Sequence, residues 1–130
     1  MGQAETEPQH LDVWIEPDAA TAGTEVLAVA GELDRDGLGA VREKIEEAWA
    51  RRPQRLVFDL ERLRFCDSSG LNLLLRVRSR AEQENVRLLL AAPGVAVRRL
   101  LELTGAETVF ELYPTVADAV GAPADSGGPR

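Results

Sequence analysis

Four consecutive residues, Asp67, Ser68, Ser69 and Gly70, offer the groups best suited to chemistry in this sequence. They stand between a strand-like segment that ends near Cys66 and an apolar run typical of a helix. A phosphate on either serine would meet the unpaired N–H groups and the positive dipole end of that helix, and Gly70 would leave room for close backbone approach. The same residue types are also ordinary helix caps, each contributing about 1 kcal/mol. The residues alone therefore leave phosphate acceptance and capping both open.

Other kinds of catalytic or metal chemistry lack their residues here. The sequence contains neither a P-loop nor a Gly-x-Gly-x-x-Gly turn that opens a helix. Its one histidine, His10, stands in a polar N-terminal stretch and its one cysteine is Cys66, which disfavours a Ser–His pair and a zinc site. A phospho-aspartate at Asp67 would need a nearby lysine, and the only one, Lys44, falls inside a predicted helix. We therefore expect no enzyme activity, no cofactor and no metal.

The charge balance restricts the class of partner. The chain has 130 residues, 22 acidic and 15 basic, with a net charge of -7. Nucleic acids and anionic lipid surfaces bind clustered Lys and Arg, so we expect neither nucleic acid nor a membrane as partner. No segment approaches the roughly 20 apolar residues that span a bilayer, and the polar start of the chain does not resemble a signal peptide. These features favour a cytoplasmic protein.

The sequence predicts a single domain with a short extension at each end. Residues 1–10 lack apolar periodicity and are expected to form a flexible arm. Residues 121–130 are rich in Gly, Pro, Ser and Ala, a composition typical of a disordered tail. The domain itself is expected to cover residues 11–120, where strand-like and helix-like segments alternate.

Periodicity within the domain predicts an α/β fold. Apolar runs and alternating segments predict strands, and stripes of spacing three and four predict helices. Alternation of the two implies a sheet with much parallel pairing, right-handed crossovers and covering helices. We expect Pro53 to end the first helix, Gly105 to end the third and Pro114 to open the last. The predicted strands are 11–15, 25–33, 56–60, one that ends near 66, 86–91 and 109–112, with helices over 37–52, from 69 onward, before 105 and from 114 onward.

Three segments in this order resemble the STAS superfamily, and within it the bacterial anti-sigma factor antagonists. The first is residues 31–34 (Gly-Glu-Leu-Asp), at the end of a predicted strand. The second is the strand 56–60 (Leu-Val-Phe-Asp-Leu), followed by 65–71 (Phe-Cys-Asp-Ser-Ser-Gly-Leu). The third is residues 97–105, similar to the third helix of the family. The resemblance runs from about Leu11 to Val120.

The resemblance implies both a fold and a switch. The fold would be a mixed sheet with helices packed mainly on one side. The switch would be phosphorylation of Ser68, the serine directly after the motif aspartate. The unphosphorylated protein would bind an anti-sigma factor that is also a serine kinase, which releases a sigma factor. Phosphorylation would end that binding, and a PP2C-type phosphatase would restore it. The partner-binding residues would be Glu32, Asp34, Asp67, Ser68, Ser69 and Gly70.

Individual residues of this surface keep alternative interpretations. Glu32 and Asp34 would bind the kinase or the cation-bearing nucleotide that it holds, or else are solvated carboxylates after a strand. Ser69 is expected to be a structural cap rather than a second acceptor. After Asp34 the chain departs from its relatives, because Gly37 and Gly39 enter the predicted helix, each weakening it by up to about 1 kcal/mol. That departure leaves the identity of the partner open.

A different assembly is the main alternative function. STAS domains also serve as protein-interaction subunits in stressosomes and in lipid-transport assemblies. Recovery of membrane transport components in a pull-down, rather than a kinase-like anti-sigma factor, would favour that interpretation.

Overall fold

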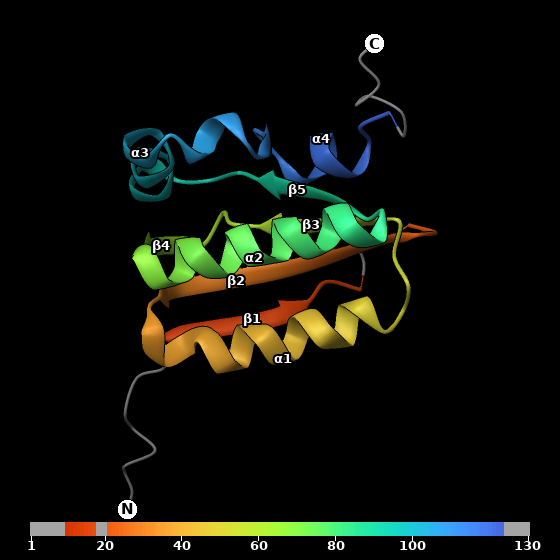
Figure 1. The fold of residues 1–130 in the computed structure, drawn as a ribbon, viewed down its shortest axis with the longest axis horizontal. Coiled ribbons are helices and arrows are strands. Elements are labelled where there is room, and N and C mark those ends of the chain that lie inside the picture. Colours follow the sequence, from red (N-terminus) through yellow and green to blue (C-terminus); the bar gives the residue numbers. More distant parts are fainter. Residues whose placement is uncertain (1–9, 18–20, 124–130) are drawn as a thin grey trace, which may run out of the picture.

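The computed structural model describes residues 10–17 and 21–123, which fold around one sheet (Figure 1). Nearly all of the predicted N-terminal arm and residues 124–130 of the predicted tail lie outside the described residues. Within the described ranges, no helix is long and apolar enough to cross a membrane.

The sheet is mixed and contains six strands in the described part of the chain. They run in the order β1-β2-β3-β5-β6, and β4 pairs with β2 off this path. Only the pair of β1 and β2 is antiparallel, and the other pairs are parallel. The strands are β1 (Leu11–Ile15), β2 (Thr24–Leu33), β3 (Arg55–Asp59), β4 (Leu63–Cys66), β5 (Arg87–Ala91) and β6 (Glu111–Tyr113).

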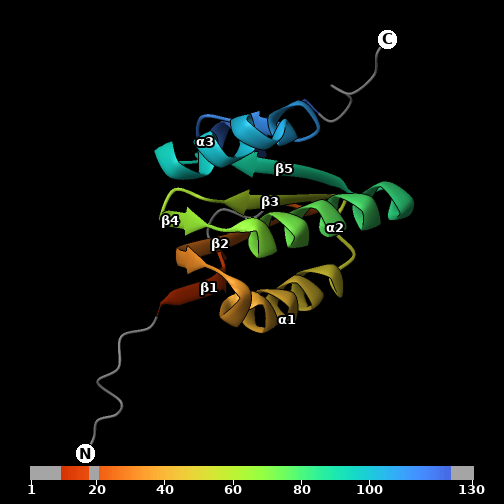
Figure 2. The same cartoon turned by 60° about the vertical axis from the view of Figure 1, so that its left-hand side comes forward.

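Helices cover mainly one face of this sheet, as expected. Figures 1 and 2 show α1 (Leu38–Trp49) and α2 (Ser68–Glu84) running side by side across it. Their apolar side chains join those of α3 (Val95–Thr104) in one core with Leu27, Phe58 and Leu90. The short helix α4 (Val116–Val120) packs on the opposite face, in a smaller cluster with Val26, Val57 and Leu89. Successive side chains along these strands therefore point alternately to the two faces of the sheet.

The ten-residue strand β2 holds the site in place because it pairs with two strands in succession. Its first half pairs with β3, and its last residues pair with β4 after a register shift at Gly31. Gly31 has φ +98°, and a Cβ there would stand 2.1 Å from the carbonyl oxygen of His10. Only glycine fits this position, which lets the end of β2 turn from one partner strand to the next.

Three element boundaries differ by two residues or more from those predicted. The first helix ends at Trp49, not Arg52, because the chain turns there and Arg52 takes φ +54°. The last strand begins at Glu111, after a 3-10 turn over Ala106–Thr108. The last helix begins at Val116 and is capped by Thr115, whose hydroxyl accepts from the N–H of Asp118 at 2.9 Å. Pro114 therefore lies before that helix.

Candidate functional site

The two sequence motifs meet where β2 and β4 end. Leu33 pairs with Cys66 and Glu32 pairs with Phe65 in parallel register. The N–H of Asp67 then donates to the carbonyl of Leu33 at 3.1 Å, which extends the pairing by one residue. Residues that lie over thirty positions apart in the sequence are thus held together by main-chain hydrogen bonds, on which side-chain changes at the surface have little effect.

The start of α2 is capped by Asp67. Its Oδ1 accepts from the N–H of Ser69 at 2.9 Å and from the N–H of Gly70 at 3.2 Å. Ser68 is the first helical residue and is exposed, whereas Ser69 follows it half-buried. The expectation that Ser69 is the structural cap is wrong, because the carboxylate one residue before the helix already does that work.

This cap also corrects the expected seat for a phosphate. We expected the first N–H groups of the helix to hold it, but those of Ser69 and Gly70 already donate to Asp67. A phosphate on Ser68 would have to displace a carboxylate or point away from it. Because both groups are negative, the Asp67 carboxylate would repel a phosphate at the place where the sequence predicted free N–H groups to bind it.

Gly70 allows the start of α2 to pack closely on the sheet. It is buried, and a Cβ at this position would stand 2.6 Å from Sγ of Cys66 and 2.8 Å from Cγ of Leu33. The helix start can approach the sheet this closely only without a side chain. Burial, together with the nearby charge of Asp67, raises the pKa of the Cys66 thiol to about 12. Cys66 therefore stays neutral and packs as a small apolar residue.

An acidic depression surrounds the serines. It has a volume of about 400 Å³ and is open to solvent. Asp34 caps the 3-10 turn Arg35–Gly37 by accepting from the N–H of Asp36 at 3.1 Å. We call this surface the acidic depression, and its lining residues are Asp34, Arg35, Asp36, Asp67, Ser68 and Ser69.

Sequence reasoning placed Asp34 and Asp67 correctly together and missed their neighbours Arg35 and Asp36. The contribution of these two depends on the tight turn after β2, and no motif marks them. Glu32 lies apart from the depression, with a half-exposed carboxylate 3.9 Å from Nδ1 of His10. Glu32 and Asp34 both lie near the end of β2, but only Asp34 lines the acidic depression.

Exposed apolar side chains also occur on β4 and at the start of α3. Phe65 on β4 is 48% exposed, and Val95, the first residue of α3, is 81% exposed. α3 packs beside β4, so both belong to the same end of the molecule as Ser68. No pattern in the sequence predicts this exposure, because β4 does not alternate: Leu63 and Cys66 are buried and the two residues between them are exposed. Exposed aromatic side chains are enriched in protein-binding surfaces, so Phe65 is a candidate contact residue.

Metal chemistry finds no support in this part of the molecule. Among the residues that the structure describes, no group of three His, Cys, Asp or Glu side chains is arranged to hold a metal ion.

The chain resembles known proteins over most of its length. The sequence model of the STAS domain matches residues 17–119. The anti-sigma-F factor antagonist RsfB of Mycobacterium tuberculosis is 34% identical over 110 residues, which are 80% of this chain and 89% of that protein. The crystal structure of an anti-sigma factor antagonist from Mycobacterium paratuberculosis superposes with a TM-score of 0.76 at 33% identity, covering 86% of this chain and 92% of that one.

A second solved relative is known in a modified state. The Bacillus cell fate determinant SpoIIAA in its phosphorylated form matches with a TM-score of 0.61 at 27% identity, covering 78% of this chain and 90% of that one.

Proposed function

Because this chain belongs to the STAS domain family, we propose that it is an anti-sigma factor antagonist switched by phosphorylation of Ser68. In its unmodified form it binds an anti-sigma factor that is also a serine kinase, and a sigma factor is released. Phosphorylation by that kinase ends the binding, and a PP2C-type phosphatase reverses the modification. We also propose that the chain acts in the cytoplasm.

Exposure of Ser68 is the observation that carries this proposal. The hydroxyl stands on the first residue of α2, at the rim of the acidic depression, where a kinase can reach it. Had this side chain been sealed in the core, the switch would be impossible. The relatives support the role, since they are anti-sigma factor antagonists and one of them has been solved phosphorylated.

The charge around Ser68 supplies the mechanism of release. A phosphate adds about -1.5 to -2 charges at neutral pH. It would join the carboxylates of Asp34, Asp36 and Asp67, against one guanidinium, that of Arg35. A partner that fits the unmodified acidic depression would have to bury this extra charge. The cost of burying it is enough to abolish a moderate interface. Release by repulsion and bulk needs no refolding of the domain.

Each predicted contact residue has a defined place in this proposal. Asp34, Asp67, Ser68 and Ser69 line the depression and would face the partner directly. Glu32 would contact it from the side, next to the exposed ring of Phe65. Gly70 would contribute from below, by allowing the start of α2 to lie against the sheet.

The test is phosphorylation and binding with candidate anti-sigma kinases encoded in the same genome. The chain is incubated with each kinase and ATP, and the modified residue is mapped by mass spectrometry. We expect one phosphate, on Ser68. Ser68→Ala should bind the kinase constitutively, and Ser68→Asp should bind at least tenfold more weakly.

Ser79→Ala is the matched control. Ser79 is exposed on the same helix, roughly 16 Å along its axis from Ser68, and should change neither binding nor modification. Phosphate on another residue would overturn the assignment of the site. Loss of binding in a normally folded Ser68→Ala variant would show that the hydroxyl is a direct contact. Capture of transport components in place of a kinase would favour the alternative assembly.

A further inference from the structure

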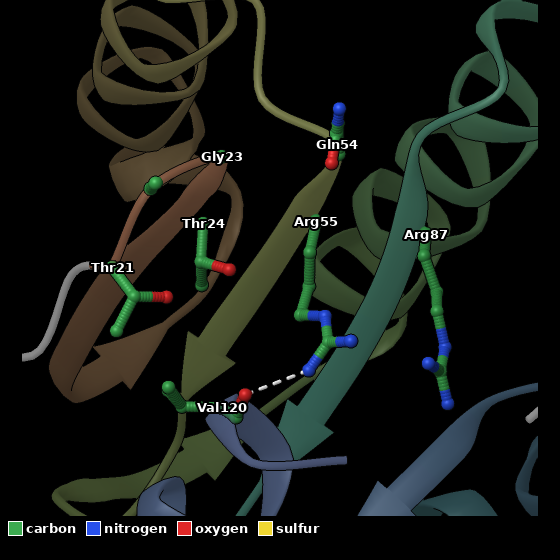
Figure 3. A pocket seen from close by; sticks show the side chains of 8 residues that line it. Thr21, Gly23, Thr24, Gln54, Arg55, Arg87 and Val120 are labelled. Carbon is green, nitrogen blue, oxygen red and sulfur yellow. Dashed lines mark hydrogen bonds between the residues drawn. The ribbon is translucent and has the colours of Figure 1, made fainter. Parts of the chain in front are cut away.

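The amino ends of the parallel strands hold a buried arginine that the proposed switch does not use. Arg55 begins β3 and is only 9% exposed. Its Nη1 donates to the carbonyl oxygens of Ala119 and Val120, at 2.9 and 2.8 Å, at the end of α4. Figure 3 shows the bond to Val120. These carbonyls fix the guanidinium in place and offer it the weak negative end of a short helix.

Most of the Arg55 guanidinium has no partner among the described residues. No hydrogen bond joins its Nε or Nη2 to any of them, and none of their carboxylates forms an ion pair with it. Glu111, which lies close enough for Arg55 to favour its charged form, is hydrogen-bonded to Arg87 at 2.8 Å. A buried positive charge is costly unless a negative group compensates it. Two neutral carbonyls do so only in part.

A pocket of about 270 Å³ opens beside this guanidinium. Figure 3 shows the hydroxyl oxygens of Thr21 and Thr24 directed to the side on which Arg55 lies. The lining contains no carboxylate among the described residues, although the chain as a whole carries a net charge of -7. The residues that line it are Thr21, Ala22, Gly23, Thr24, Gln54, Arg55, Arg87 and Val120.

We propose that this pocket binds a small oxyanion of the phosphate class, with Arg55 as its principal ligand. A fixed guanidinium presents N–H donors in the geometry that phosphate oxygens accept. The threonine hydroxyls and the amide of Gln54 can donate to the remaining oxygens. Since a water molecule occupies about 30 Å³ of liquid, the pocket has room for a tetrahedral anion and a few waters.

This site is separate from Ser68. Thr24, Arg55 and Arg87 begin three neighbouring parallel strands, whereas the acidic depression lies beyond the opposite ends. β2 alone, with its ten residues, separates the two ends by roughly 30 Å. The anion is therefore not the phosphate of the modified serine of the same molecule.

The test is a titration of the ¹⁵N-labelled full chain with inorganic phosphate, followed by NMR at constant ionic strength with chloride as the balancing anion. We expect saturable shifts of the amides of Thr21, Gly23, Thr24 and Gln54, without shifts at Ser68. Arg55→Gln should weaken binding at least tenfold. Arg51→Gln, which removes an exposed guanidinium paired with Glu25, should leave it unchanged.

A second variant keeps the test decisive if Arg55→Gln fails to fold. Thr24→Val preserves the β-branched shape of the side chain and removes one donor, and should weaken phosphate several-fold with the strand intact. The proposal is overturned if phosphate produces no saturable shift. It is also overturned if every variant that folds, including Thr24→Val alone, binds phosphate as tightly as the unmodified chain does. Shifts scattered over exposed arginines, without saturation at the pocket, would overturn it equally.

Discussion

Replacing Gly70 by alanine should destabilise the domain, although alanine is the better helix former. The new methyl group would stand 2.6 Å from Sγ of Cys66 and 2.8 Å from Cγ of Leu33. Carbon atoms make ordinary contacts at about 3.5–4.0 Å, so the start of α2 would have to move by about 1 Å. Both contacts come from residues on paired strands, whose main chains are held by the sheet, so neither can retreat easily.

The magnitude follows from two opposing terms. Overpacking of a well-filled core costs about 1–3 kcal/mol, and the gain in helix propensity from Gly to Ala returns up to about 1 kcal/mol. We expect a net loss of about 1–2 kcal/mol in the free energy of unfolding. For a domain of this size, that lowers the melting temperature by roughly 4–10 °C.

Gly39→Ala is the matched control for this substitution. Gly39 is exposed in the first turn of α1, and a Cβ there would meet nothing within 4 Å. The same change should therefore leave the stability unchanged or raise it by up to about 1 kcal/mol. Both variants are compared by urea unfolding monitored by circular dichroism. Should Gly70→Ala be as stable as the unmodified chain, the close packing of α2 on Leu33 and Cys66 would be refuted.

Two further predictions concern the same corner of the fold. Asp67→Ala removes the cap of α2 and should lower the free energy of unfolding by about 1 kcal/mol in urea, with Asp67→Asn losing less; an unchanged Ala variant would contradict the cap. Burial raises the pKa of the Cys66 thiol from 9.0 to about 12. A thiol reagent should modify Cys66 only after unfolding, and rapid modification of the folded chain would contradict its burial. The contribution of the neutral thiol to the free energy of unfolding should be lost as the pH rises from about 9 to 12.

Local pattern was sufficient to predict the elements but not all their ends. The five residues of β3 are all buried, which is why a short apolar run predicted that strand to within one residue. Gly105 ends α3 with φ +78°, as a glycine there predicts. Pro53 and Pro114 predicted the wrong helix ends. Proline marks a place where a helix cannot continue or can begin, but the helix can end before it or begin after it. The first helix ends because Arg52 takes a positive φ, which the local sequence does not signal. The last helix begins after Thr115, a residue type that favours the N-cap position, and the prediction from Pro114 overlooked it.

The resemblance to the STAS family implied that Asp34 and Asp67 are neighbours, and the pairing of β2 with β4 confirms their proximity. The sequence left open which of Asp67, Ser68 and Ser69 caps the helix. Which group caps α2 depends on the extended conformation of Asp67, with φ -97° and ψ -173°. That conformation follows from the hydrogen bond of its N–H to Leu33, a tertiary contact. The exposure of Phe65 likewise depends on how little covers β4, and no spacing in the sequence reports it.

The cap at Asp67 decides what kind of switch this surface can be. Because its carboxylate already satisfies the N–H groups of Ser69 and Gly70, α2 needs no phosphate to be stable. A phosphate on Ser68 would gain little from the helix and would face a carboxylate one residue away. Two unit charges about 4 Å apart near a protein surface repel by about 4 kcal/mol at an effective dielectric constant of about 20. The proposed modification would therefore be driven outward, where it would alter the surface seen by a partner and leave the helix beneath it in place.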